Sequence, residues 1–113
     1  MNKYENVVLP EDKGLAGVYK WVEMENIGVE ANLILWDNGA GLIDMLGVVE
    51  NVKYDDKIMH SAGEGAVPQT YSYANGTLTW TVTDKDGVQV STFVKLTAEE
   101  LAKYRARGIG KGK

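Results

Sequence analysis

The segment Thr77–Thr83 alternates between threonine and apolar residues, and this pattern constrains the fold more strongly than any other in the chain. In an extended strand, Leu78, Trp80 and Val82 share one face and the four threonines share the other. Asn75-Gly76, directly before this segment, is typical of a tight hairpin turn. The segment therefore predicts a hairpin strand with one buried and one solvated face.

Similar short runs rich in Val, Ile, Thr, Tyr and Trp recur between residues 17 and 96. Successive runs are about 8–12 residues apart, which favours hairpin connections over helical crossovers. Turn residues separate them at Asp37-Asn38-Gly39, Asp55-Asp56 and Asp86-Gly87. The sequence predicts an all-β, antiparallel up-and-down meander of about eight strands. The expected strands are Val18–Glu25, Asn32–Trp36, Ala40–Leu46, Val49–Tyr54, Lys57–Ala62, Gln69–Tyr73, Thr77–Thr83 and Val88–Leu96.

The pattern changes after Leu96. Thr97 and Glu100 have the spacing of a capping box, which predicts a short C-terminal helix over residues 97–108. Leu101 and Tyr104 lie on one face of it, and we expect them to dock on the sheet. Residues 1–16 read as an N-terminal arm and residues 109–113 as a fraying tail, so the 113 residues form a single domain.

Composition excludes several classes of protein. The chain has no cysteine, which rules out disulfides and cysteine-based zinc sites within it. Residues 1–96 carry 14 acidic and 7 basic side chains, a balance that disfavours nucleic-acid binding. No apolar run approaches the roughly 20 residues of a transmembrane helix. We expect a cytoplasmic protein if Met1 is the natural start, and the oligomeric state stays open.

The order of aromatic and turn residues resembles the small lipocalin-like domains of bacterial secreted lipoproteins. The resemblance covers residues 17–96 and rests on four motifs. These are Gly17-x-Tyr19-x-Trp21, then Leu33-x-Leu35-x-x-Asn38-Gly39-x-Gly41, then Tyr71-x-Tyr73-x-Asn75-Gly76-x-Leu78, and finally Asp86-Gly87 followed by Phe93-x-Lys95.

This resemblance implies a lipocalin-like barrel, usually without enzymatic activity, that belongs to a cell-surface protein. It therefore implies an extracytoplasmic location and a non-catalytic binding or accessory module. The chain departs from the family in three ways. Asn38 stands where aspartate is common, the lipobox cysteine is absent, and the C-terminal helix is not part of the shared pattern. The alternative is a structural or interaction domain whose barrel is filled by side chains.

Bulky rings are the candidate interior and ligand-binding residues. An eight-stranded barrel is just wide enough to be filled by side chains or to hold one small molecule. Inward rings therefore either line a cavity for a small apolar ligand or plug the barrel, and the sequence leaves both readings open. No cofactor is implied. The candidates are Trp21, Trp36, Tyr71, Tyr73, Trp80 and Phe93.

No catalytic or metal-ligating residue is nominated. His60 and Ser61 are neighbours in an expected strand, so their side chains should point to opposite faces, which breaks a Ser–His–acid arrangement. His60 with Asp55, Asp56 or Glu64 lacks the spacing of a metal site. Residues 63–68 read as a loop without the features of a phosphate cradle. The acidic residues Glu23, Glu25, Asp44 and Glu50 are expected to be solvated.

Overall fold

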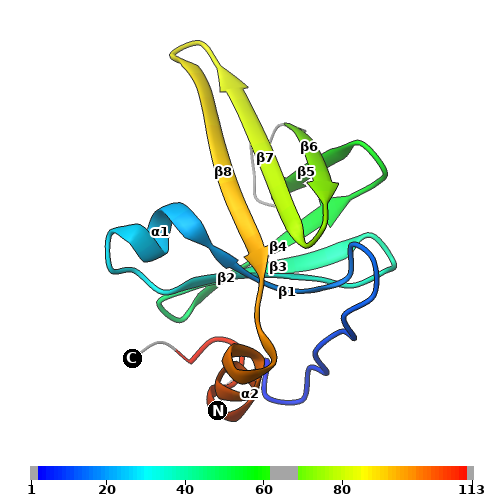
Figure 1. The fold of residues 1–113 in the computed structure, drawn as a ribbon, viewed down its shortest axis with the longest axis vertical. Helices are drawn as coiled ribbons and strands as arrows, with labels where there is room; N and C mark the ends of the chain where they lie inside the picture. The colour runs from blue at the N-terminus through cyan, green and yellow to red at the C-terminus, as the bar shows by residue number, and fades with distance from the viewer. Residues whose placement is uncertain (1–2, 62–68, 112–113) are drawn as a thin grey trace.

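The fold is a closed barrel of antiparallel strands with a helix packed outside it (Figure 1). This computed structural model describes residues 3–61 and 69–111, apart from the side chain of Asp84. Within those ranges each strand pairs with the next, and β8 pairs with β1 to close the ring. The predicted all-β meander is therefore confirmed. The elements are β1 Gly17–Trp21, α1 Val22–Asn26, β2 Ala31–Leu35, β3 Ala40–Met45, β4 Val48–Tyr54, β5 Ile58–Ser61, β6 Gln69–Ala74, β7 Thr77–Asp84, β8 Gly87–Lys95 and α2 Ala98–Arg107.

Turn chemistry fixes the hairpins where the sequence indicated it. Asn75 and Gly76 both have positive φ, at 51° and 82°, as a two-residue hairpin turn with matching twist requires. At the β2–β3 hairpin the backbones approach so closely that a Cβ on Gly41 would lie 2.6 Å from the carbonyl oxygen of Ile34. Glycine at this position therefore permits the register that the barrel uses.

The predicted strand Val18–Glu25 is wrong in its second half. The strand β1 ends at Trp21, and Val22–Asn26 forms the short helix α1, which Gly28 terminates at φ 80°. The Glu23 carboxylate accepts a hydrogen bond from the backbone N–H of Thr92 on β8, 2.7 Å away. The helix places Glu23 where β1 would otherwise have continued beside β8.

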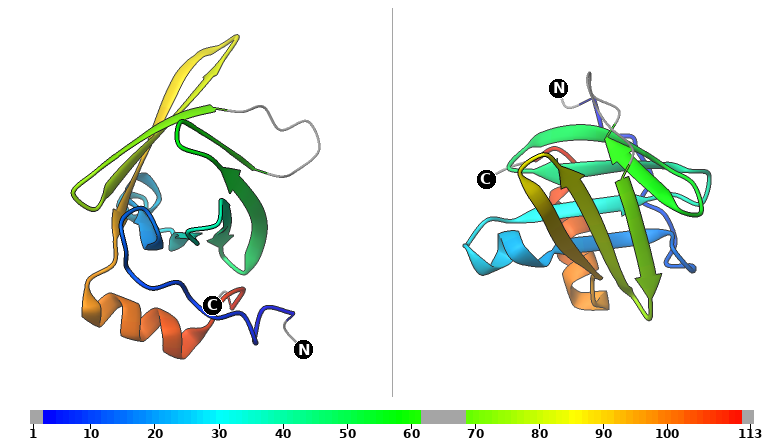
Figure 2. Two further views of the ribbon diagram at one scale, coloured as in Figure 1. Left: turned by 90° about the vertical axis from the view of Figure 1, so that its right-hand side faces the viewer. Right: turned by 90° about the horizontal axis from the view of Figure 1, so that it is seen from above.

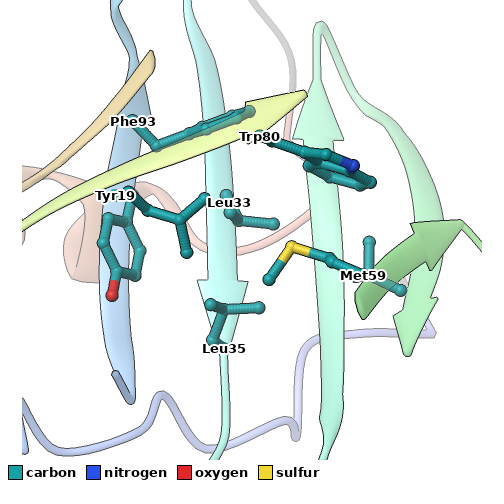
Figure 3. Close-up of a cluster of buried hydrophobic side chains, with 8 residues drawn as sticks. Tyr19, Leu33, Leu35, Met59, Trp80 and Phe93 are labelled. Atoms are coloured by element: carbon teal, nitrogen blue, oxygen red, sulfur yellow. The ribbon is translucent and has the colours of Figure 1, made fainter. Parts of the chain in front are cut away.

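Alternate residues of each strand point into the barrel and build its core. The residues labelled in Figure 3 come from β1, β2, β5, β7 and β8 and gather around the barrel axis. The fully or almost fully buried set is Tyr19, Leu33, Leu35, Val52, Met59, Leu78, Trp80 and Phe93. The predicted inward face of Leu78, Trp80 and Val82 is thereby confirmed. The predicted loop 63–68 and the end of the predicted strand Lys57–Ala62 lie outside the described residues.

A second core lies outside the barrel, between the wall and α2. Figure 2 shows α2 against one end of the molecule with the N-terminal arm alongside it. Tyr104 and Ile109 pack there against outward-facing residues of β1, β2 and β3, namely Val18, Ile34 and Leu42. The helix begins with the predicted capping box, in which the Glu100 N–H donates to the Thr97 hydroxyl at 3.1 Å and the Thr97 N–H donates to the Glu100 carboxylate at 2.9 Å.

Two expectations about this region are wrong. Ile109 is buried rather than frayed, with 3% of its surface exposed. Asp44 is buried rather than solvated, because its Oδ2 accepts from the Tyr104 hydroxyl at 2.5 Å and from the Gly110 N–H at 3.0 Å. The residues that follow α2 therefore help to fix the helix to the barrel.

Candidate functional site

One end of the barrel contains a cavity of about 600 Å³. Its lining comes from the strand ends nearest to α1 and to the β7–β8 hairpin, which projects beyond the rest of the wall (Figure 1). A volume of this size is typical of sites that hold a small organic molecule. The apolar part of the lining is Trp21, Ile43, Trp80, Val82 and Phe93.

Tyrosines close the opposite end. The inward positions farther along β1, β4 and β6 are Tyr19, Tyr54, Tyr71 and Tyr73, and none of them lines the cavity. Tyr19 and Tyr73 meet edge to face at 6.4 Å, as do Tyr54 and Tyr71. The Tyr19 hydroxyl donates to the carbonyl oxygen of Leu15 in the N-terminal arm at 2.6 Å, and burial raises the pKa of that hydroxyl. This end of the barrel is a packed core.

The charged side chain of Lys95 lies at the same end of the barrel. Its ammonium lies over the rings of Tyr19 and Tyr73, at 5.9 and 5.5 Å from their centroids. It also binds the Asp12 carboxylate and the Gly14 carbonyl oxygen of the arm. The N-terminal arm is thus attached to the closed end of the barrel.

The structure separates the six predicted interior residues into three groups. Trp21, Trp80 and Phe93 line the cavity, and both indoles pack against Phe93 with centroids 5.3 and 6.1 Å away. Tyr71 and Tyr73 face inward but lie at the closed end. The prediction that Trp36 faces the interior is wrong. Trp36 packs outside the barrel in the core beneath α2, and its indole N–H donates to the carbonyl oxygen of Val8 at 3.0 Å.

The indole N–H groups of Trp21 and Trp80 are the unusual feature of this site. Both nitrogens are buried, and neither has a hydrogen-bond partner in the described structure. Trp80 is only 8% exposed, and its nitrogen lies on the ring edge turned away from Phe93 (Figure 3). A buried donor without an acceptor costs about 1–3 kcal/mol. Both indoles belong to residues that line one cavity, so a small movement of either ring would let its N–H meet an acceptor on a ligand.

Polar side chains form the rest of the lining, and the sequence reasoning did not select them. The sequence of β8 indicates two of them, because Gln89 and Ser91 alternate onto the same face as Phe93. Gln69 joins two strands at this end, because its side-chain oxygen accepts from the Thr83 N–H at 3.0 Å. Glu50 is the acidic residue among the described lining residues, and none of those residues is a lysine or an arginine. The polar lining is Glu50, His60, Ser61, Gln69, Thr83, Gln89 and Ser91.

The contacts of His60 do not form a hydrolytic arrangement. Its Nδ1 lies 3.0 Å from the backbone carbonyl oxygen of Ser61, not from the Ser61 hydroxyl. Within residues 3–61 and 69–111, no three His, Asp or Glu side chains gather closely enough to hold a metal ion. Neither helix in the same ranges has the length and apolar character needed to cross a membrane. The described geometry offers a cavity with donors, acceptors and aromatic surface.

Comparison of the chain with protein-family models, with curated proteins and with solved structures found no match.

Proposed function

We propose that this protein is a non-catalytic binding module of lipocalin-like type, which holds one small molecule in the open end of its barrel. The observation that carries the proposal is the pair of buried, unpartnered indole N–H groups beside a cavity of about 600 Å³. A ligand that accepts from either of them recovers a hydrogen bond that the unliganded protein lacks. Attachment to a cell-surface lipoprotein belongs to the same proposal and rests on the resemblance alone.

The lining favours a neutral amphiphile as the ligand. Trp21, Trp80 and Phe93 present aromatic surface to an apolar body. The indole N–H groups can donate only to a hydrogen-bond acceptor on the ligand, such as a hydroxyl or carbonyl oxygen. An anionic headgroup would lie near Glu50 with no lysine or arginine in the described lining to pair with it, so carboxylates are disfavoured.

The second candidate function is a structural or interaction domain with no small-molecule ligand. The closed end favours it, because the tyrosine rings and Lys95 fill that half of the interior with side chains. In this case the cavity is a shallow recess above a packed core, and the barrel serves as a rigid support for surface contacts.

Tryptophan fluorescence distinguishes the two functions. We expect retinol, a neutral amphiphile, to change the emission of the wild-type protein saturably, and palmitate and cellotetraose to do so weakly or not at all. Trp21→Phe and Trp80→Phe each remove one indole donor and should raise the Kd about fivefold. Trp36→Phe is the matched control, because Trp36 lies outside the barrel and its loss should leave the Kd unchanged.

Three outcomes count against the proposal. Unchanged emission with all three compounds favours the structural domain. Tighter binding of palmitate than of retinol contradicts the neutral ligand. An equal loss of affinity in the Trp36→Phe variant places the binding site outside the barrel.

A further inference from the structure

A second hollow, of about 510 Å³, lies on the outside of the barrel. It separates α2 from the outer faces of β1 and β2, and the segment from Gly28 to Asn32 forms one wall. Its lining shares no residue with that of the barrel cavity, so it is independent of the proposed function. The apolar floor includes Val29, Ala31 and Leu96.

The charged side chains around this hollow are already paired. The Lys20 ammonium lies 3.0 Å from the Glu100 carboxylate and 3.5 Å from that of Glu25. The Arg107 guanidinium pairs with Glu30 and lies 4.0 Å from Asp44. A ligand with a net charge would therefore have to break an existing ion pair before it could form its own.

Two buried polar atoms in the lining residues have no partner in the described structure. One is Oδ1 of Asn32, a residue that is only 5% exposed. Its Nδ2 donates to the carbonyl oxygen of Tyr19 at 3.2 Å, which assigns the amide orientation and leaves the oxygen as the free acceptor. The other is Nε of Arg107, whose guanidinium lies over the Tyr104 ring, 4.9 Å from the centroid. The hollow thus lacks one donor for Asn32 and one acceptor for Arg107.

We propose that this hollow is a second binding site, specific for a neutral carboxamide group. A carboxamide carries an N–H donor and a carbonyl acceptor on one small planar unit, and so supplies both missing partners without adding charge. Both atoms have almost no exposed surface, so neighbouring side chains must move when the ligand enters. The apolar floor accepts a short alkyl group on the carboxamide.

Nitrogen-15 NMR titration of the full chain with three matched probes tests the site. Isobutyramide has the donor and the acceptor, methyl isobutyrate lacks the donor, and isobutyrate lacks the donor and carries a negative charge on its acceptor oxygens. We expect isobutyramide at millimolar concentration to shift the Asn32 side-chain and Arg107 Nε resonances. Shifts with the other two probes should be smaller. Arg107→Lys keeps the charge but removes Nε, and it should raise the Kd for isobutyramide about fivefold.

Arg105→Lys is the matched control. It makes the same change on the same helix, but Arg105 does not line the hollow, so this variant should bind isobutyramide as the wild type does. Equal shifts with the amide and the ester mean that Asn32 receives no donor and overturn the proposal. Larger shifts with isobutyrate indicate simple charge attraction and also overturn it. So do shifts confined to the indole N–H resonances of Trp21 and Trp80, which report the barrel cavity.

Discussion

The two halves of the barrel wall are built differently. From β1 to β3 both faces are covered, by the interior core and by α2 with the N-terminal arm, and all five residues of β2 are buried, whereas the outer face of β4 is largely exposed. From β5 to β8 only the inner face is covered, while Val88 and Val90 of β8 are 63% and 51% exposed. Ladder length does not follow this division, because β5 and β6 pair through two residue pairs but β7 and β8 through eight. The difference in coverage indicates that α2 and the N-terminal arm stabilise the wall from β1 to β3, while β5 to β8 depend on the interior core.

The largest expected contrast is between core truncations in the two halves. Ile34→Ala empties a position that is fully buried under α2, and it should lower the free energy of unfolding by about 2–5 kcal/mol. Val90→Ala removes methyl groups from the outer face of β8 and should change it by no more than about 0.5 kcal/mol. Urea unfolding measures both. Similar losses in the two variants would show that the halves are equally packed in solution.

A smaller contrast is expected for two tyrosine hydroxyls. Tyr104→Phe removes the hydrogen bond to buried Asp44, which should cost about 1–2 kcal/mol in unfolding free energy. Tyr71→Phe removes a hydroxyl that donates to the carbonyl oxygen of Asp55 at the surface of the other half, and it should cost about 0.5 kcal/mol or less. Thermal unfolding of the two variants side by side measures the difference. A greater loss for Tyr71→Phe would reverse the comparison.

The smallest effect is a pH dependence that arises in the covered half. Hydrogen bonds from the Thr97 backbone, and then from Lys20, lower the pKa of Glu100 below its ordinary value of 4.5. A carboxylate whose pKa is lower in the folded state stabilises the fold at pH values above its unfolded pKa, and this contribution is lost as the pH falls through the folded pKa. Glu100→Gln should therefore flatten the decline in stability below about pH 5.

Glu99→Gln is the control for this effect. It removes the same charge from the same turn of α2, at a side chain that is 82% exposed and does not reach β1. The acid-induced decline of this variant should match that of the wild type. If Glu99→Gln flattens the decline as much as Glu100→Gln does, the effect comes from net charge and not from the contact between α2 and β1.

Local signals in the sequence were enough to predict the meander, because each hairpin depends on alternation and on its own turn residues. Asn75-Gly76 and the Thr97–Glu100 capping box appear as expected. The failures involve residues whose environment depends on distant segments. Glu23 lies in a helix instead of a strand, and its carboxylate accepts a hydrogen bond from the backbone of Thr92. Asp44 is buried because Tyr104 and Gly110 donate to it.

Local alternation also explains why only part of the candidate site could be predicted from the sequence. Trp21, Trp80 and Phe93 follow the alternation of their strands into the cavity. Trp36 extends the apolar run Leu33–Trp36, in which both faces are buried, so hydrophobicity alone did not reveal which residues point inward. The unpartnered indole N–H groups depend on which acceptors surround each ring, and no local pattern encodes that.

The hydrogen bond from Thr92 to Glu23 has a consequence for how copies of this protein behave when crowded. Beyond the three residue pairs that join β8 to β1, the next backbone donor of β8 already has a carboxylate partner. A strand from another molecule that approached this seam would meet an occupied donor and a negative charge, so growth of the sheet from one copy to the next is blocked there. A single acidic side chain thereby disfavours edge-to-edge pairing at this position of β8.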